Sequence, residues 1–135
     1  MKLVPYIHFQ GNAEEAMNFY ATALGGSIAY LQRYGDSPMP SDEDYKQKIM
    51  HGRLTFGDNL IMISDVFKGQ EVSTDGNIQL SVDVLENEEL ESVFNKMAEG
   101  GTVAMPLQDT FWGARFGMLK DKFGVSWMFN QELKK

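Results

Sequence analysis

Cysteine is absent from this chain of 135 residues, so it can form neither a disulfide framework nor a thiolate nucleophile or metal site. No apolar run approaches the ~18 residues of a membrane-spanning helix, and the N-terminal stretch turns polar by Gln10, which argues against a signal peptide. Basic residues are scarce: 12 Lys and Arg stand against 19 Asp and Glu, for a net charge of −7. Because an acidic surface repels phosphate, we expect no nucleic-acid partner. The absence of cysteine and of a long apolar run predicts a soluble cytoplasmic protein with no membrane partner.

The acidic balance has two interpretations. It would attract a cationic ligand, or it serves only to keep the protein in solution, which is the commoner reason for such a charge. Hydrophobic residues make up 43% of the chain and aromatic residues 12%, which excludes wholesale disorder. A chain of this length and composition is expected to fold as one domain, residues 1–135.

Apolar periodicity and glycine positions predict two similar series of elements. The first series begins with a strand, has a helix that starts at Asn12 with Glu14 and Glu15 in its first turn, and continues with three strands. The second series repeats this order. The predicted strands are 3–9, 27–34, 48–56 and 59–65, then 77–84, 102–108, 114–120 and 125–130; the predicted helices end at Gly25-Gly26 and span 87–99.

An internal repeat supports this division. Several residues return when 75 is added to their number: Asn12 and Asn87, Glu14 and Glu89, Phe19 and Phe94, Gly25-Gly26 and Gly100-Gly101. The shared order of elements carries more weight than these identities. We therefore predict an α+β fold of two βαβββ modules, about 1–67 and about 75–135, with mostly antiparallel curved sheets around a cleft.

Each predicted sheet has an apolar face for its helix and an opposite polar face. The polar faces either meet solvent or line a shared pocket, and the repeat favours the pocket. The residues predicted to line it are Tyr6, His8, His51, Arg53, Asn77, Gln79, Ser126, Met128 and Trp112.

Both histidines of the chain, His8 and His51, lie on the predicted polar faces. They could act as acid–base groups or bind a metal, although an ordinary surface or core histidine is the more frequent case. Arg53 and Arg115 could hold a carboxylate or phosphate, or simply be solvated. A G-x-S-x-G, Walker A or H-E-x-x-H motif is absent. The turn Gln10-Gly11-Asn12 is too poor in glycine for a nucleotide-type cofactor such as S-adenosylmethionine.

Several stretches resemble the PhnB-like branch of the vicinal oxygen chelate superfamily, which includes glyoxalase I, bleomycin-resistance proteins and extradiol dioxygenases. They are PYIHFQGNAEEAMNFY (5–20), LGG (24–26), KIMHGRLTFGDNLIMISD (48–65), GG (100–101) and, most specifically, FWGARFGMLKDKFGVSWMFN (111–130). The resemblance implies the glyoxalase/bleomycin-resistance/dioxygenase fold, a homodimer and a small-molecule ligand.

Enzymes of this superfamily hold a divalent metal with one ligand from each of four strands. Carried over one by one, these positions fall on Val4 or Pro5, near Arg53, on Asn77 and on Met128. Of these side chains only the amide of Asn77 suits such a metal, so the resemblance implies that the usual metal site is lost and no cofactor is expected, although a divalent metal at other residues stays open.

Two functions therefore stay open. The first is a protein that binds a small organic ligand without metal. The second is an enzyme of lyase, isomerase or dioxygenase type. It would use a rearranged metal site around His51, or His8 or His51 as a general base.

Overall fold

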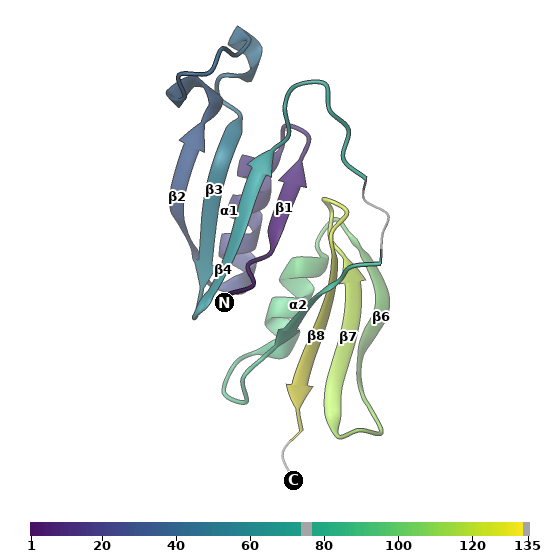
Figure 1. The fold of residues 1–135 in the computed structure, drawn as a ribbon. Coiled ribbons are helices and arrows are strands. Elements are labelled where there is room, and N and C mark those ends of the chain that lie inside the picture. Colours follow the sequence, from purple (N-terminus) through teal and green to yellow (C-terminus); the bar gives the residue numbers. More distant parts are fainter. Residues whose placement is uncertain (74–76, 134–135) are drawn as a thin grey trace. The chain divides into compact units, whose positions relative to one another are not determined.

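A computed structural model describes residues 1–73 and 77–133, and the chain divides into two compact units, residues 1–73 and 74–135 (Figure 1). The first unit contains β1 (Tyr6–Phe9), α1 (Ala13–Leu24), β2 (Ser27–Arg33), β3 (Ile49–Phe56) and β4 (Asn59–Asp65), with two short 3-10 helices, η1 (Tyr34–Asp36) and η2 (Glu43–Tyr45), between β2 and β3. The second unit contains β5 (Leu80–Asp83), α2 (Leu90–Ala98), β6 (Thr102–Asp109), β7 (Ala114–Lys120) and β8 (Ser126–Glu132). The predicted βαβββ order is confirmed in both.

Each unit forms one four-stranded sheet, with strand orders β1-β4-β3-β2 and β5-β8-β7-β6. The first strand of each module pairs in parallel with the last, and the other neighbours are antiparallel. The hairpin between β3 and β4 turns at Gly57, whose φ of 55° lies in the left-handed region that favours glycine. The predicted mostly antiparallel α+β fold is confirmed, whereas the union of the two modules into one domain stays a prediction.

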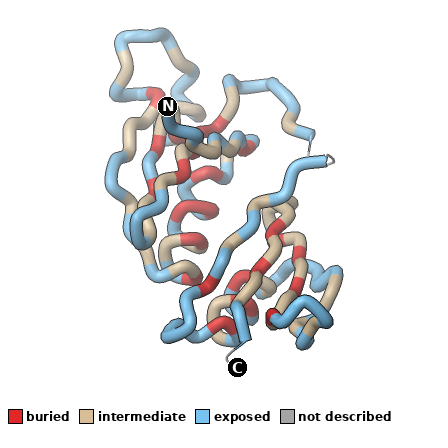
Figure 2. Tube along the Cα trace, turned by 60° about the horizontal axis from the view of Figure 1, so that its bottom comes forward, coloured by how far each residue is buried: buried red, intermediate tan, exposed pale blue. Residues whose placement is uncertain are grey.

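A single helix covers one face of each sheet. Helix α1 packs on β2, β3 and β4, and α2 packs on β6, β7 and β8. In the first unit the buried residues gather along α1 and its sheet, as Figure 2 shows, and Met17, Tyr20 and Leu54 are fully buried. One inner strand of each sheet, β3 in the first and β7 in the second, has a glycine under the helix. A Cβ on Gly52 would lie 2.6 Å from Met17 Cε, and one on Gly117 would lie 2.8 Å from Phe94 Cε2.

The start of α1 differs from the prediction in the source of its cap. Asn12 occupies the N-cap position, but its side chain makes no capping hydrogen bond in the described part of the chain. The carboxylate of Asp65, at the end of β4, accepts hydrogen bonds from Gly11 N at 2.8 Å and Ala13 N at 2.9 Å. Its other oxygen accepts one from Ile49 N at 2.8 Å. Asp65 is buried, and it satisfies helix donors that a local side chain was expected to take.

The second module begins later than predicted. Strand β5 starts at Leu80, and Ile78, expected on the apolar face, is 80% exposed. Helix α2 starts at Leu90 because the residues before it form a turn, in which Glu88 Oε1 accepts a hydrogen bond from Leu85 N at 2.9 Å. The amide of Gln131 donates to Leu85 O and Glu88 O and holds this turn against the end of β8.

Among the described residues, the helices are all too short or too polar to span a lipid bilayer.

Candidate functional site

The polar face of the first sheet carries the two histidines. On β1, Phe9 is buried toward the core, so Tyr6 and His8 alternate to the opposite face. The register places Tyr6 beside Met62 and His8 beside Ser64 on β4, and Met62 beside Arg53 on β3. These side chains therefore share the face that α1 does not cover, as the alternation predicts.

Five residues on this face form what we call the imidazole cluster: Tyr6, His8, Tyr30, His51 and Ser64. The rings of Tyr6 and His8 are stacked, with centroids 4.7 Å apart and planes 17° apart. Tyr6 Oη lies 3.0 Å from His51 Nδ1, and His8 Nδ1 lies 3.0 Å from Ser64 Oγ. The Tyr30 ring lies 6.0 Å from that of His51. Tyr6 thus links histidines from two strands that are not neighbours.

Both imidazoles are held through the same ring nitrogen. The Nδ1 atom of His51 is engaged by a phenol and that of His8 by a serine hydroxyl, and within residues 1–73 and 77–133 neither Nε2 atom makes a hydrogen bond. A hydrogen bond at Nδ1 fixes the orientation of the ring, and whether the hydroxyl donates or accepts there decides which ring nitrogen carries the proton. Each histidine can therefore present Nε2 to a ligand, as a donor or as an acceptor.

The remaining predicted site residues lie elsewhere. Arg53 is exposed on the polar face of the first sheet, whereas Asn77, Gln79, Trp112, Ser126 and Met128 belong to the second unit. Asn77 and Gln79 precede β5 and are exposed, and Ser126 and Met128 alternate with the buried Trp127 and Phe129 on β8.

Trp112 lies in the connection between β6 and β7. It is 55% exposed and packs edge-on against Phe111 and Phe116, while Phe111 is 97% exposed, so this connection does not belong to the core. Arg115 pairs with Gln131 and shares the helix side of its sheet with Gly117, so it is not on the polar face with Met128.

Sequence reasoning missed Ser64 and Tyr30. Ser64 is only 5% exposed. Its hydroxyl can be buried because it has a hydrogen-bond partner in His8. The signal was present, since Ser64 is in phase with Leu60 and Met62 on the strand predicted for 59–65.

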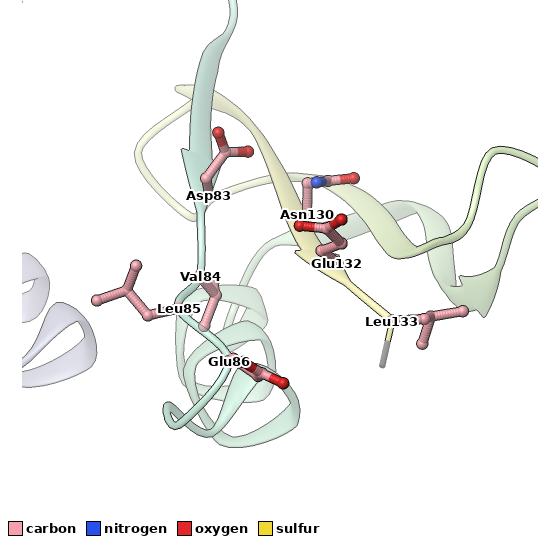
Figure 3. Close-up of a pocket in the computed structure, with 7 residues that line it drawn as sticks. All are labelled: Asp83, Val84, Leu85, Glu86, Asn130, Glu132 and Leu133. Atoms are coloured by element: carbon pink, nitrogen blue, oxygen red, sulfur yellow. The ribbon is translucent and has the colours of Figure 1, made fainter. Parts of the chain in front are cut away.

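The second unit has a hollow of about 470 Å³ that the sequence did not reveal (Figure 3). Its lining residues are Asp83, Val84, Leu85, Glu86, Asn130, Glu132 and Leu133. Asp83 and Asn130 are paired across β5 and β8, and Figure 3 shows their side chains on the same side of these strands. The three carboxylates give this hollow an acidic lining.

A family model described as 3-demethylubiquinone-9 3-methyltransferase matches residues 1–129. The chain is also 31% identical to protein YjdN of Escherichia coli K12, over 96% of this chain and 95% of that protein. The chain belongs to this PhnB-like family. The resemblance noted in the sequence is therefore confirmed.

Solved structures share the fold of this chain over nearly its whole length. Protein PA1353 from Pseudomonas aeruginosa is 43% identical, with a TM-score of 0.89 and coverage of 99% of each chain. A putative 3-demethylubiquinone-9 3-methyltransferase, PhnB protein, from Bacillus cereus is 31% identical, with a TM-score of 0.81 over 97% of this chain and 99% of that one. A glyoxalase-related enzyme from Fulvimarina pelagi shares the fold, with 17% identity and a TM-score of 0.64 over 98% of this chain and 89% of that one.

The metal that the resemblance implies does not fit the residues of this chain. Val4, Pro5 and Arg53 offer no ligand atom for a hard cation, and the thioether of Met128 is too soft. Within the described residues, no three His, Asp or Glu side chains lie close enough together to hold a metal ion.

The methyl donor suggested by the family's description has no matching site at the first strand–helix turn either. The backbone N–H groups of Gly11 and Ala13, which a cofactor would need there, already donate to Asp65.

Proposed function

We propose that this PhnB-like protein binds a small planar organic ligand on the imidazole cluster, without a metal ion. The observation that carries the proposal is the stacked Tyr6–His8 pair, tied to His51 through the Tyr6 hydroxyl. Tyr6 and Tyr30 are 42% and 48% exposed, so part of each ring is accessible. A planar ligand would stack on these rings, and the Nε2 atoms would orient it by hydrogen bonds.

Arg53 adds a preference for a carboxylate. It is exposed, it lies on the same face, and it is paired across the sheet with Tyr30 and Met62. A guanidinium beside exposed aromatic rings suits a planar acid better than a planar base.

The test uses the fact that the chain has two histidines and that both belong to the cluster. We expect 2-naphthoate to shift the imidazole NMR signals of His8 and His51, and cyclohexanecarboxylate, which has the same charge and no aromatic ring, to shift them far less. Tyr6→Ala should weaken naphthoate binding about tenfold, and Phe111→Ala should not change it. Unshifted imidazole signals, or a Tyr6→Ala protein that binds as well as the wild type, would refute the proposal.

The Tyr6–His51 hydrogen bond favours a second candidate, an enzyme in which His51 is a general base. When Nδ1–H of His51 donates to the phenolic oxygen of Tyr6, Nε2 is unprotonated and can take a proton from a bound carbon acid. Phenylpyruvate in D₂O provides a test, because a base at this position should accelerate deuterium exchange at its methylene group. His51→Ala should abolish the acceleration, whereas a variant as active as the wild type would rule out His51 as the base.

The absence of metal is a separate expectation. Purified protein should contain no stoichiometric divalent metal, and a chelator should leave its melting temperature unchanged, because the positions that would hold the metal lack suitable ligands. Elemental analysis and thermal unfolding with and without EDTA check both points. One tightly held Zn²⁺, Ni²⁺ or Fe²⁺ per subunit would contradict the proposal.

We further propose that the protein forms a homodimer. The exposed Phe111 and Trp112 support this, since large apolar side chains of this kind often lie at interfaces. Light scattering should give about 30 kDa, twice the chain mass of 15.2 kDa. A mass of one chain at micromolar concentration would contradict it.

A further inference from the structure

A second cavity lies in the first unit, beside the loop between β2 and β3. It measures about 260 Å³, and three of its lining residues are aromatic: Tyr34, Tyr45 and Phe67. The Tyr34 ring lies 5.1 Å from that of Tyr45 and 6.0 Å from that of Phe67, at angles of 59° and 60°. Rings inclined in this way form separate walls rather than a flat stack. We call this cavity the aromatic hollow.

The hydroxyl groups of both tyrosines are turned into the protein. Tyr34 Oη donates a hydrogen bond to Asp65 O at 2.7 Å, and Tyr45 Oη donates one to Val66 O. Burial, with the nearby Asp65 charge, raises the pKa of Tyr45 to about 12, so its phenol stays neutral. The tyrosine rings therefore line the hollow, while their hydroxyl groups donate hydrogen bonds to backbone carbonyls.

Two carboxylates at the rim converge on one ammonium group. Lys68 Nζ lies 2.8 Å and 2.9 Å from the two carboxylate oxygens of Asp44 and 3.2 Å from Asp42 Oδ2. Asp42 and Lys68 line the hollow together with the aromatic rings. The surrounding segment 35–46 is acidic, with four Asp and Glu against one Lys. Two carboxylates and one ammonium leave a net negative charge at the rim.

We propose that the aromatic hollow is a binding site for an alkylammonium group and that Lys68 competes with such a ligand for the carboxylates at its rim. Aromatic walls with acidic partners are the arrangement that recognises organic cations, because ring faces and carboxylates both attract positive charge. The volume suits a small head group, since it lies below the ~300 Å³ at which pockets for drug-sized ligands begin. The three charged side chains at the rim are about half exposed or more, and exposed ion pairs of this kind are weak, so a ligand can displace Lys68.

The experiment removes the internal competitor. The probe is n-butylammonium, which reproduces the end of a lysine side chain, and 1-butanol is its uncharged counterpart. Binding is followed by NMR titration of the Phe67 and Tyr45 ring signals. Lys68→Met should bind butylammonium at least fivefold more tightly than the wild type and at least tenfold more tightly than it binds 1-butanol. Lys96→Met, which removes the same charge from α2, should leave the affinity at the wild-type value.

A second pair of variants tests the aromatic walls. In the Lys68→Met background, Phe67→Ala should lower the affinity for butylammonium about 5- to 30-fold, the range expected for one cation–π contact. Phe111→Ala in the same background should have no effect. A Lys68→Met protein that binds no more tightly than the wild type, an equal gain in Lys96→Met, or equal binding of 1-butanol would each overturn the proposal. Asp44→Asn provides a further variant with little risk to folding, and it should lower the affinity as well.

Discussion

The two modules share one framework but differ in what they place at equivalent positions. Gly52 pairs with Ile63 in the first sheet and Gly117 with Phe129 in the second, and both glycines lie under the helix. Counting from these pairs, Ser64 corresponds to Asn130. The framework is kept where the helix meets the sheet, and the side chains vary on the uncovered face.

The uncovered faces have different chemistry. His8 of the first module corresponds to Asp83 of the second, and His51 corresponds to Phe116. The first face therefore offers imidazoles and phenols, whereas the second offers carboxylates, an amide and a thioether. A duplicated framework thus provides two surfaces that can be specialised separately.

The starts of the two helices are also held by residues at equivalent positions, but one residue accepts hydrogen bonds and the other donates them. By the same register, Asp65 corresponds to Gln131 at the end of the last strand. Asp65 accepts hydrogen bonds from backbone N–H groups before and at the start of α1, whereas Gln131 donates to two carbonyls before α2. Both side chains tie the entrance of a helix to the end of a sheet, but only Asp65 is buried and charged.

Removing the side chains of Asp65 and Gln131 should produce the largest difference in stability loss between the two modules. Asp65→Ala leaves two buried N–H donors and one part-buried donor without their partner, and we expect a loss of about 3–5 kcal/mol in the free energy of unfolding. Gln131→Ala should cost only about 1 kcal/mol, because its partners are exposed to water. Urea denaturation followed by circular dichroism measures both. Equal losses would show that the two positions are energetically alike.

Hydrogen exchange sharpens this comparison. Asp65→Ala should accelerate amide exchange in α1 and leave exchange in α2 unchanged. Asp65→Asn keeps the shape and one carbonyl oxygen, so it should lie between the wild type and Asp65→Ala. A uniform acceleration over both helices would mean that the effect of Asp65 is not confined to its own module.

The glycines under the helices should differ by a smaller amount. In Gly117→Ala the new Cβ meets the Phe94 ring at 2.8 Å and Leu107 Cδ2 at 2.9 Å, so we expect a loss of about 2–3 kcal/mol. In Gly52→Ala it meets the flexible end of Met17, which can adapt, and the loss should be about 1 kcal/mol. Thermal unfolding of both variants checks the order, and the reverse order would contradict this account.

The smallest effect concerns the first turn of α1. Both carboxylate oxygens of Glu14 accept hydrogen bonds from Arg33, at 2.9 Å and 2.8 Å, and these bonds lower the pKa of Glu14. A lowered folded-state pKa means that the stabilisation is present above the unfolded value near 4.5 and is lost as the pH falls through the folded value. Glu14→Gln should cost about 0.5 kcal/mol at pH 7, as expected for an exposed pair, and nothing at pH 2.

Glu91, which like Glu14 is the second residue of its helix, provides a comparison in the first turn of α2. Glu91→Gln should cost less than Glu14→Gln at pH 7, if the Arg33 contact rather than the helix dipole dominates. Urea midpoints of both variants at pH 7 and pH 2 decide the point. A pH-independent loss in Glu14→Gln would exclude the ion pair as its cause.

Local pattern was sufficient to predict most of the fold. The bounds of β4 and β7 agree with the predicted 59–65 and 114–120, since turn residues flank a clear alternation there. The predicted strand 77–84 and helix 87–99 were too long, because Glu88 and Gln131 form a turn through contacts that periodicity does not encode. The capping side chain of α1 was assigned to Asn12 for the same reason. The carboxylate that accepts hydrogen bonds at the start of this helix belongs to Asp65, which is distant in sequence.

The candidate site was less accessible to sequence reasoning. Alternation placed Tyr6, His8 and His51 on one face, but it could not show that Tyr6 joins the two histidines, which depends on the strand order β1-β4-β3. The aromatic hollow was missed altogether. Tyr34, Tyr45 and Phe67 lie on three separate segments, and only the pairing of the loop with β4 residues brings them together.

The parallel pairing of β1 with β4 has a consequence for synthesis of the chain. Residue 6 pairs with residue 62, so the strand made first has no partner until almost the whole module has been translated. During that interval the nascent chain carries an unpaired short strand, and α1 waits for the carboxylate that completes its first turn. On the ribosome, we therefore expect this module to complete its sheet only after residue 65 has emerged from the exit tunnel.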